Sequence, residues 1–296
     1  MISSTNSFIR SLLAGCLLLF LLAGCSANRP AEIRTTVVNS PVIAVMPVEN
    51  LSGIPAPLVG MRNEIVFHLE KSSGNVLAFD RLEAFIVQHR LRYIGGMSHD
   101  TARILKAETG ADVALFTALE YYNDQSPPKI ALSARLVTTG DRPQILWMDG
   151  VGAAGNDAPG FLELSLVEDP DILLRLAVSR LTASLVNHLA NQAPAAADDR
   201  RSFEPQTVFN SRLLLPDRMY TVVVLPFLNL SSRRHAGEMM MGHFTAALKQ
   251  VADMQPVEPG QVRHTLLKFR IVMHDGLSLA DATALFSRMN VDLILS

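Results

Sequence analysis

The sequence is poor in cysteine, in tryptophan and in long apolar runs. Two of its 296 residues are cysteines, Cys16 and Cys25, and one is tryptophan. Both cysteines lie in the first 25 residues, so the rest of the chain has no thiol for a disulfide or a thiol nucleophile. The 26 basic residues nearly balance the 28 acidic ones, which gives no indication of a nucleic-acid partner.

The amino terminus has the layout of a secretory signal. Arg10 precedes an apolar run from Leu12 to Leu22, and two small residues follow before Cys25. The run has about eleven residues, whereas a helix needs about twenty to cross a bilayer. We therefore predict that 1–24 is a cleaved signal peptide.

The four residues that end at Cys25 resemble the lipobox of bacterial lipoproteins. The same letters end at Cys16, but too few apolar residues lie between Arg10 and Cys16 to form the hydrophobic region of a signal. We predict that Cys25 carries fatty acyl chains such as palmitate, which form a permanent membrane anchor when there are three. Ser26, by resemblance to the sorting rule of enteric bacteria, favours the outer membrane, with the body facing the periplasm. The alternative is an ordinary signal peptide with a chance cysteine.

An internal repeat organises the remaining chain. The segment 45–52 recurs at 224–231, at an offset of 179. Seven further residues are identical to the residue 180 positions later: Arg90, Gly96, Ser98, Ala102, Leu105, Asp112 and Leu115. The repeat predicts two related domains.

The predicted organisation follows from this repeat and from composition. The tether is 25–40, the first domain with a trailing helix is 41–192, the linker is 193–219, and a partial second copy is 220–296. Because the second copy stops inside what should be its third strand, the sequence is expected to be truncated relative to the gene. The alternative is that another segment or a partner supplies the missing edge.

The pattern of both copies predicts an α/β fold. Each is expected to be an α/β sandwich in which helices pack against a mixed sheet. The predicted strands are 41–48, 76–79, 113–120, 130–138, 144–149 and 220–227. The predicted helices include the stripes at Met61, Ile65, Leu69 and Met240, Phe244, Leu248, and the spans 100–109, 171–191 and 279–289. Ser98 and Ser278 are expected to cap helices at their start, and Gly110 and Asn290 at their end.

The segment 43–52, with 79–81, Arg90, Gly96 and 110–112 at suitable distances, resembles a group of envelope lipoprotein domains. The group includes the curli-secretion lipoprotein CsgG, LpoB-like activators of penicillin-binding proteins and the amino-terminal domain of TolB. The resemblance implies a noncatalytic domain that assembles, secretes or activates by contact. The connections at 51–58 and 123–129 are too short for the membrane hairpins of the curli channel.

One glycine-rich segment resembles a nucleotide-binding motif. Gly150–Gly155 matches the dinucleotide fingerprint and follows a predicted strand. Nucleotide binding requires a helix that starts inside the motif, and Pro159 with Gly160 would break such a helix. A flexible loop is therefore favoured over a nucleotide site.

Other distinctive residues have structural explanations. The eight histidines show no metal-ligand spacing, and no nucleophile elbow occurs, so we expect no catalytic residue, no metal and no cofactor. Asn50-Leu51-Ser52 and its copy at 229–231 are expected to form Asx turns rather than a shared ligand contact. At 239–241 only Met240 aligns with the core stripe, with an adaptable partner surface as the alternative. The basic cluster 233–235 is expected to be a solvated loop.

The sequence therefore favours a noncatalytic, membrane-anchored periplasmic lipoprotein that binds a protein partner in envelope assembly or export. The alternative is a regulator that activates a peptidoglycan-synthesising enzyme, and a distant alternative is a nucleotide-dependent enzyme. A homo-oligomer is left open. The short tether from Cys25 favours a body held near the membrane.

Overall fold

The computed structural model describes most of the chain after the amino terminus. The described residues are 40–72, 75–157, 166–191, 207, 211, 214–215, 217–271, 273 and 276–296. The signal peptide, Cys16, Cys25, Ser26, Pro159, Gly160 and most of the predicted linker lie outside them, so their roles stay predictions, as do the domain boundaries. Residues 40–296 pack as one unit. Among the described helices, none is both long and apolar enough to cross a bilayer.

The amino-terminal half, residues 43–189, is built on a mixed sheet. Its elements are β1 (Ile43–Val45), β2 (Glu49–Asn50), α2 (Leu58–Ser72), α3 (Phe79–Gln88), α4 (His99–Thr109), β3 (Val113–Asn123), β4 (Lys129–Thr138), β5 (Ile145–Ala154) and α5 (Pro170–Leu189). The strand order is β1-β3-β4-β5, with β2 also beside β3. β1 and β2 run parallel to β3, and the β3-β4 and β4-β5 pairs are antiparallel.

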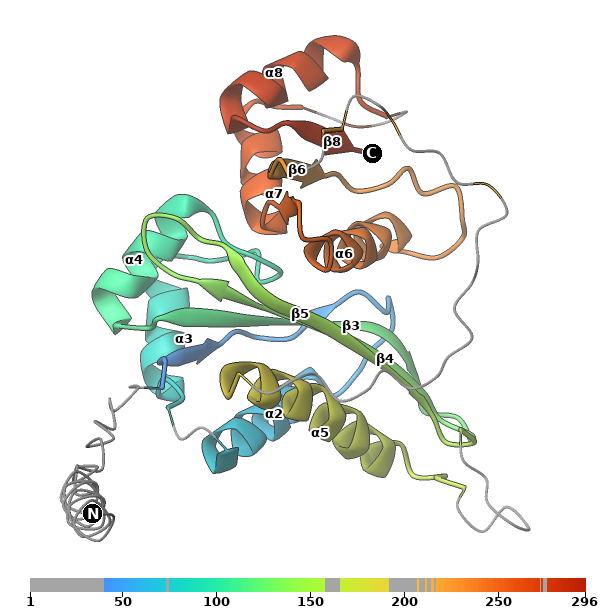
Figure 1. Cartoon of the computed structure of the whole chain (residues 1–296). Helices are drawn as coiled ribbons and strands as arrows, with labels where there is room; N and C mark the ends of the chain where they lie inside the picture. Colours follow the sequence, from blue (N-terminus) through green and yellow to red (C-terminus); the bar gives the residue numbers. More distant parts are fainter. Residues whose placement is uncertain are drawn as a thin grey trace, which may run out of the picture. The chain divides into compact units, whose positions relative to one another are not determined.

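Both faces of this sheet are covered, which explains why β3 is apolar on both sides. Val113 and Leu115 point into a core shared with α2 and α5, which lie together on one face (Figure 1). Ala114 and Phe116 point into the core formed with α3 and α4. Successive residues of β3 therefore stabilise opposite layers.

The carboxyl-terminal half, residues 220–295, has a smaller sheet. Its elements are β6 (Tyr220–Val224), α6 (Ala236–Lys249), β7 (Met254–Pro256), α7 (Pro259–Lys268), α8 (Leu279–Met289) and β8 (Leu293–Leu295). The order is β7-β6-β8, and both pairs are parallel. The described residues contain no counterpart of β4 and β5 in this half, so its sheet has no antiparallel pair.

Equivalent positions of the two halves make equivalent bonds. Ile43 pairs with Val113 in the first half, and Val222 pairs with Leu293 in the second. The Asp112 carboxylate accepts from the amide of Val42 at 2.8 Å, and that of Asp292 accepts from the amide of Thr221 at 2.9 Å. These pairs lie 179 or 180 residues apart, at the offsets of the sequence repeat.

The predicted α/β fold class and several helix ends are confirmed. Ser98 and Ser278 accept hydrogen bonds from the amides of Thr101 and Asp281 and so cap α4 and α8. Gly110 and Asn290 end these helices with positive φ, at 72° and 50°. The trailing helix predicted at 171–191 is α5.

Two predicted elements are wrong, the strand at 76–79 and the glycine loop. Val76 forms only an isolated bridge with Ile43, and Phe79 begins α3 instead of ending a strand, because Leu82 and Phe85 give it a buried helical face. The strand predicted at 41–48 is confirmed as β1, which stops before Pro47 because proline lacks the amide needed to continue the ladder; β2 follows after Pro47 as a separate strand. β5 continues through Gly150 and Gly152, which pair with Ser133 and Ala131, so most of the expected loop is strand.

Candidate functional site: a cleft between the two halves

A buried ion pair joins the two halves. Arg135 of β4 lies 3.1 Å from the Glu258 carboxylate, Nη2 to Oε1, and the Glu258 side chain is fully buried. Glu258 also caps α7, because its Oε2 accepts from the amide of Gln261 at 3.0 Å. Burial raises the pKa of Glu258, and the Arg135 guanidinium opposes that rise. A buried carboxylate of this kind needs its partner, so the pair fixes α7 against the first sheet.

Two glycines allow the backbones to meet at this joint. A Cβ on Gly260 would lie 2.2 Å from the amide nitrogen of Met97, and a Cβ on Gly96 would lie 2.8 Å from the Cα of Gly260. Neither position tolerates a side chain without a backbone shift. The Gln261 side chain adds a hydrogen bond to the carbonyl of Pro143, at 2.8 Å.

α6 of the second half packs on the sheet of the first half, at a part of its surface that α3 and α4 do not cover. Met239 packs with Leu51 and Ala118 in a small buried cluster. His243 Nε2 lies 3.1 Å from Glu120 Oε2, and this contact raises the pKa of His243, whereas burial lowers it less. For Glu120, burial is the largest single influence and raises the pKa. The hydrogen bonds from His243 and Ser133 together outweigh it, so the pKa of Glu120 is lowered.

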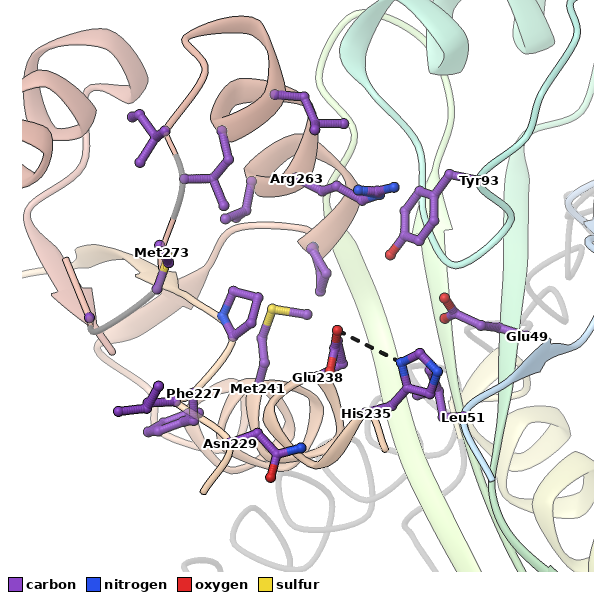
Figure 2. A pocket seen from close by; sticks show the side chains of 18 residues that line it. Glu49, Leu51, Tyr93, Phe227, Asn229, His235, Glu238, Met241, Arg263 and Met273 are labelled. Carbon is purple, nitrogen blue, oxygen red and sulfur yellow. Dashed lines mark ion pairs between the residues drawn. The ribbon is translucent and has the colours of Figure 1, made fainter. Parts of the chain in front are cut away.

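Beside this joint lies a cleft of about 650 Å³ (Figure 2). Its floor is apolar and comes mainly from the carboxyl-terminal half: Pro226, Phe227, Leu228, Met241, Pro259, Val262, Leu266, Leu267, Ile271 and Met273. Its polar lining combines the two halves: Glu49 and Tyr93 from the first, and Asn229, His235, Glu238 and Arg263 from the second. The volume is within the range of about 300–1,000 Å³ found for ligand pockets.

The polar side chains of the cleft differ in how they are held. The Arg263 guanidinium lies 4.5 Å from the centre of the Tyr93 ring, and the Tyr93 hydroxyl donates to the carbonyl of Gly95 at 3.0 Å. Burial, aided by the Glu49 charge, raises the pKa of Tyr93 to about 12, so this hydroxyl keeps its proton at neutral pH. His235 and Glu238 lie 3.8 Å apart.

Glu49, the first residue of β2, faces the cleft (Figure 2). Its carboxylate lies against Gly95, where a Cβ would be 2.0 Å from Oε2. Burial raises the pKa of Glu49, and Arg135 acts in the opposite direction. Among the ion pairs found within 4 Å in the described residues, none includes this carboxylate.

The structure explains the motifs of the sequence in local terms. Both Asx turns form, with Ser52 and Ser231 donating to Asn50 Oδ1 and Asn229 Oδ1, each from its hydroxyl at 2.7 Å. In the glycine motif, Gly150 and Gly152 lie in an antiparallel strand, so no helix begins there to receive a pyrophosphate. In the described part of the chain, no three or more His, Cys, Asp or Glu side chains are placed to hold a metal ion.

Of two predictions around α6, one is wrong and one is confirmed. Met239 and Met241 are buried, with 6% and 9% of their surface exposed, whereas Met240 is 43% exposed. Met240 aligns with Met61, but Met61 is covered by the core that includes α5, and the described residues give the second half no equivalent helix. The loop predicted at 233–235 is confirmed, since it lies outside any helix or strand and all three residues are exposed. Within it, Arg233 also donates to the carbonyl of Glu120 at 2.7 Å and lies over the Tyr121 ring.

The cleft is not evident from the sequence. Its residues come from β2, the loop before α4, the segment after β6, α6, α7 and the segment before α8, and no local motif links all of them. One signal was available in the repeat: Arg62 and Glu83 correspond to Met241 and Arg263. A charged pair in one copy is therefore absent from the other.

Comparison with known proteins gives only distant likenesses. No family model matches the chain, and no curated protein matches it. Among solved structures, the lipoprotein GNA1162 from Neisseria meningitidis is 19% identical, with a TM-score of 0.34, and the match covers 50% of this chain and 96% of that one. The LpoB carboxyl-terminal domain from Salmonella enterica is 16% identical, with a TM-score of 0.33 and coverage of 40% and 86%. The PelC dodecamer from Paraburkholderia phytofirmans is 11% identical, with a TM-score of 0.31 and coverage of 47% and 83%.

These neighbours include bacterial lipoproteins. The resemblance to the curli lipoprotein and to the TolB domain stays a prediction from sequence.

Proposed function

We propose that this protein is a noncatalytic, membrane-anchored lipoprotein of the outer membrane that faces the periplasm and binds a protein partner in envelope assembly or export. The cleft between the two halves is its binding site. The anchor is an acylated Cys25.

The observation that supports this proposal is the composition of the cleft. An apolar floor surrounded by a few charged and aromatic groups is the usual form of a recognition site. At its edge, Leu228 and Leu267 are 52% and 63% exposed, so an occupant longer than one side chain would bury further apolar surface. Tyr93 and Arg263 are of the residue types that dominate binding energy at interfaces.

The joint between the halves supports a rigid site. Glu258 with Arg135, and Gly260 against Gly96, fix α7 relative to the first sheet. Because α7 supplies much of the floor, the cleft is preorganised, which lowers the entropic cost of binding.

The proposal is tested by capture from envelopes solubilised in detergent, with the full chain as bait. The matched control is the double variant M241R/R263E, which places in the cleft the arginine and glutamate found at the equivalent positions of the first half. We expect one protein to be retained by the native chain and lost with the variant. Equal retention by both, or no specific protein, contradicts the proposal.

The identity of the captured protein separates the two candidate roles. An assembly or export component supports the leading function, whereas a peptidoglycan-synthesising enzyme supports the regulator. The anchor is tested separately with Cys25→Ser, which should abolish incorporation of radiolabelled palmitate and release the chain from membranes. Incorporation that persists in Cys25→Ser would contradict the predicted site.

A further inference from the structure

The cleft has a counterpart in the first half that is closed. In that half, the Arg62 side chain occupies the space between α2, α3 and the end of β1. Its Nε donates to the carbonyl of Val45 at 2.9 Å, its Nη1 pairs with Glu83, and its guanidinium lies 4.7 Å from the centre of the Phe79 ring. Arg62 is 6% exposed. The chain's own cation therefore fills this space.

The equivalent positions of the second half cannot make these contacts. Arg62, Phe79 and Glu83 correspond to Met241, Pro259 and Arg263, and all three of the latter line the cleft. The second half therefore lacks the cation on α6, the ring at the start of α7 and the carboxylate on α7. The cleft is open where the first half holds a guanidinium.

A carboxylate nevertheless remains at the cleft, supplied by the other half. Glu49 is held in the wall against Gly95, and Glu238 of α6 lies at the cleft as well. The cationic groups whose charge acts on Glu49 are each engaged elsewhere. Arg135 pairs with Glu258, His235 lies 3.8 Å from Glu238, and Arg263 is held over the Tyr93 ring. A half-buried carboxylate without an ion pair is complementary to a cation, and an occupant that covered it without pairing would leave a costly buried charge.

From these observations, and on the basis of the proposed function, we propose that the occupant of the cleft is a peptide segment of the partner that carries an arginine or lysine flanked by apolar residues. The cation meets Glu49 in the way that Arg62 meets Glu83. The flanking apolar side chains cover the floor formed by Phe227, Met241 and Leu266 and reach the exposed Leu228 and Leu267.

The test measures the binding of three labelled nonapeptides to the full chain in detergent by fluorescence polarisation. The peptides are leucine- and alanine-rich and differ only at the central residue, which is arginine, glutamine or glutamate. We expect the arginine peptide to bind at least about tenfold more tightly than the glutamine peptide, since hydrogen bonds to charged groups contribute this much. The glutamate peptide should bind weakest.

Variants identify the group that is responsible. Glu49→Gln should weaken binding of the arginine peptide by about tenfold and leave the glutamine peptide unchanged. Glu70→Gln, which removes an exposed carboxylate of α2 outside the cleft, should change neither. M241R/R263E should abolish binding of all three, because it fills the cleft.

Other results would overturn the inference. These are no binding of the arginine peptide at millimolar concentration, tighter binding of the glutamate peptide together with its loss in Arg263→Gln, or an equal effect of Glu49→Gln on every peptide. If the envelope partner is still captured by the native chain and lost with M241R/R263E, such a result rejects the cation and leaves the proposed function standing. If the arginine peptide does not bind and the native chain also captures no partner that M241R/R263E loses, the cleft is not a binding site.

Discussion

The two halves have equivalent grooves, one beside α2 and one beside α6. The backbone around them is similar, but one groove is filled by side chains and the other is open. In the first half the groove is closed by Arg62 and Glu83, and in the second it is an open cleft beside Met241 and Arg263. The framework is set by strand register, helix caps and Asx turns, which the halves share. The difference therefore rests on a few side chains, and a repeated fold can keep one copy as a scaffold while the other retains an open surface.

The largest effect is expected at the joint that holds the two halves together. Arg135→Met leaves the buried carboxylate of Glu258 without its partner and should lower the free energy of unfolding by about 3 kcal/mol or more. Urea unfolding measures this change. The double variant R135M/E258Q should lose less, because it removes the unpaired charge. Equal losses in both variants would show that the ion pair does not hold the joint.

The next effect concerns the close approach of the backbones. Gly260→Ala should cost about 1–3 kcal/mol, because its Cβ would meet the backbone of Met97. Gly152→Ala is the matched control. Gly152 lies in β5, and a Cβ at this position would have no heavy atom within 4 Å. Urea unfolding of the two variants should separate them clearly. A Gly260→Ala protein as stable as the control would mean that the halves are not in contact at this point.

A smaller effect is expected from opening the closed groove. Arg62→Met removes a buried hydrogen bond to Val45 and the pairing with Glu83, and should cost about 1–2 kcal/mol. Thermal unfolding should show a lower midpoint, whereas M241R/R263E should hold or raise it. If Arg62→Met leaves the midpoint unchanged, the pair of Arg62 with Glu83 does not stabilise the first half and does not explain why its groove is closed.

The smallest effect is a pH dependence where α6 meets β3. The pKa of His243 is raised by Glu120, so the stabilisation from its charge is complete below the unfolded pKa of about 6.5 and is lost as pH rises through the folded value. The lowered pKa of Glu120 means that its contribution is lost as pH falls through that folded value, below about 4.5. Since the His243 side chain is 60% exposed, His243→Gln should cost only about 0.5 kcal/mol at pH 5.5 and less at pH 8.5. A cost that is larger at pH 8.5 than at pH 5.5 would contradict this assignment.

Much of the framework could be predicted from the sequence because its signals are local. Ser98 and Ser278 cap helices by hydrogen bonds within three residues, and Gly110 and Asn290 end them by backbone conformation alone. Asn50 and Asn229 likewise make their turns within four residues. Such features depend little on tertiary context.

The cleft could not be predicted in the same way because its contacts are distant in sequence. Glu258 meets Arg135 across 123 residues, and Arg263 meets the Tyr93 ring only after the halves have packed. The exposure of Met240 depends on the absence, in the described residues, of a helix equivalent to α5, and a helical stripe alone does not reveal that. The glycines at 150–155 mimic a nucleotide motif, but β-sheet pairing determines their conformation.

If the proposed function is right, the open cleft contacts a partner and its closed counterpart does not. Leu267 lies at the cleft and is 63% exposed, and Val87, at the equivalent position of α3, is 73% exposed. Each is replaced in turn by a photo-crosslinking residue in the full chain, in intact envelopes. We expect one discrete adduct from position 267 and none of that mass from position 87. The same adduct from both positions, or none from position 267, would contradict it.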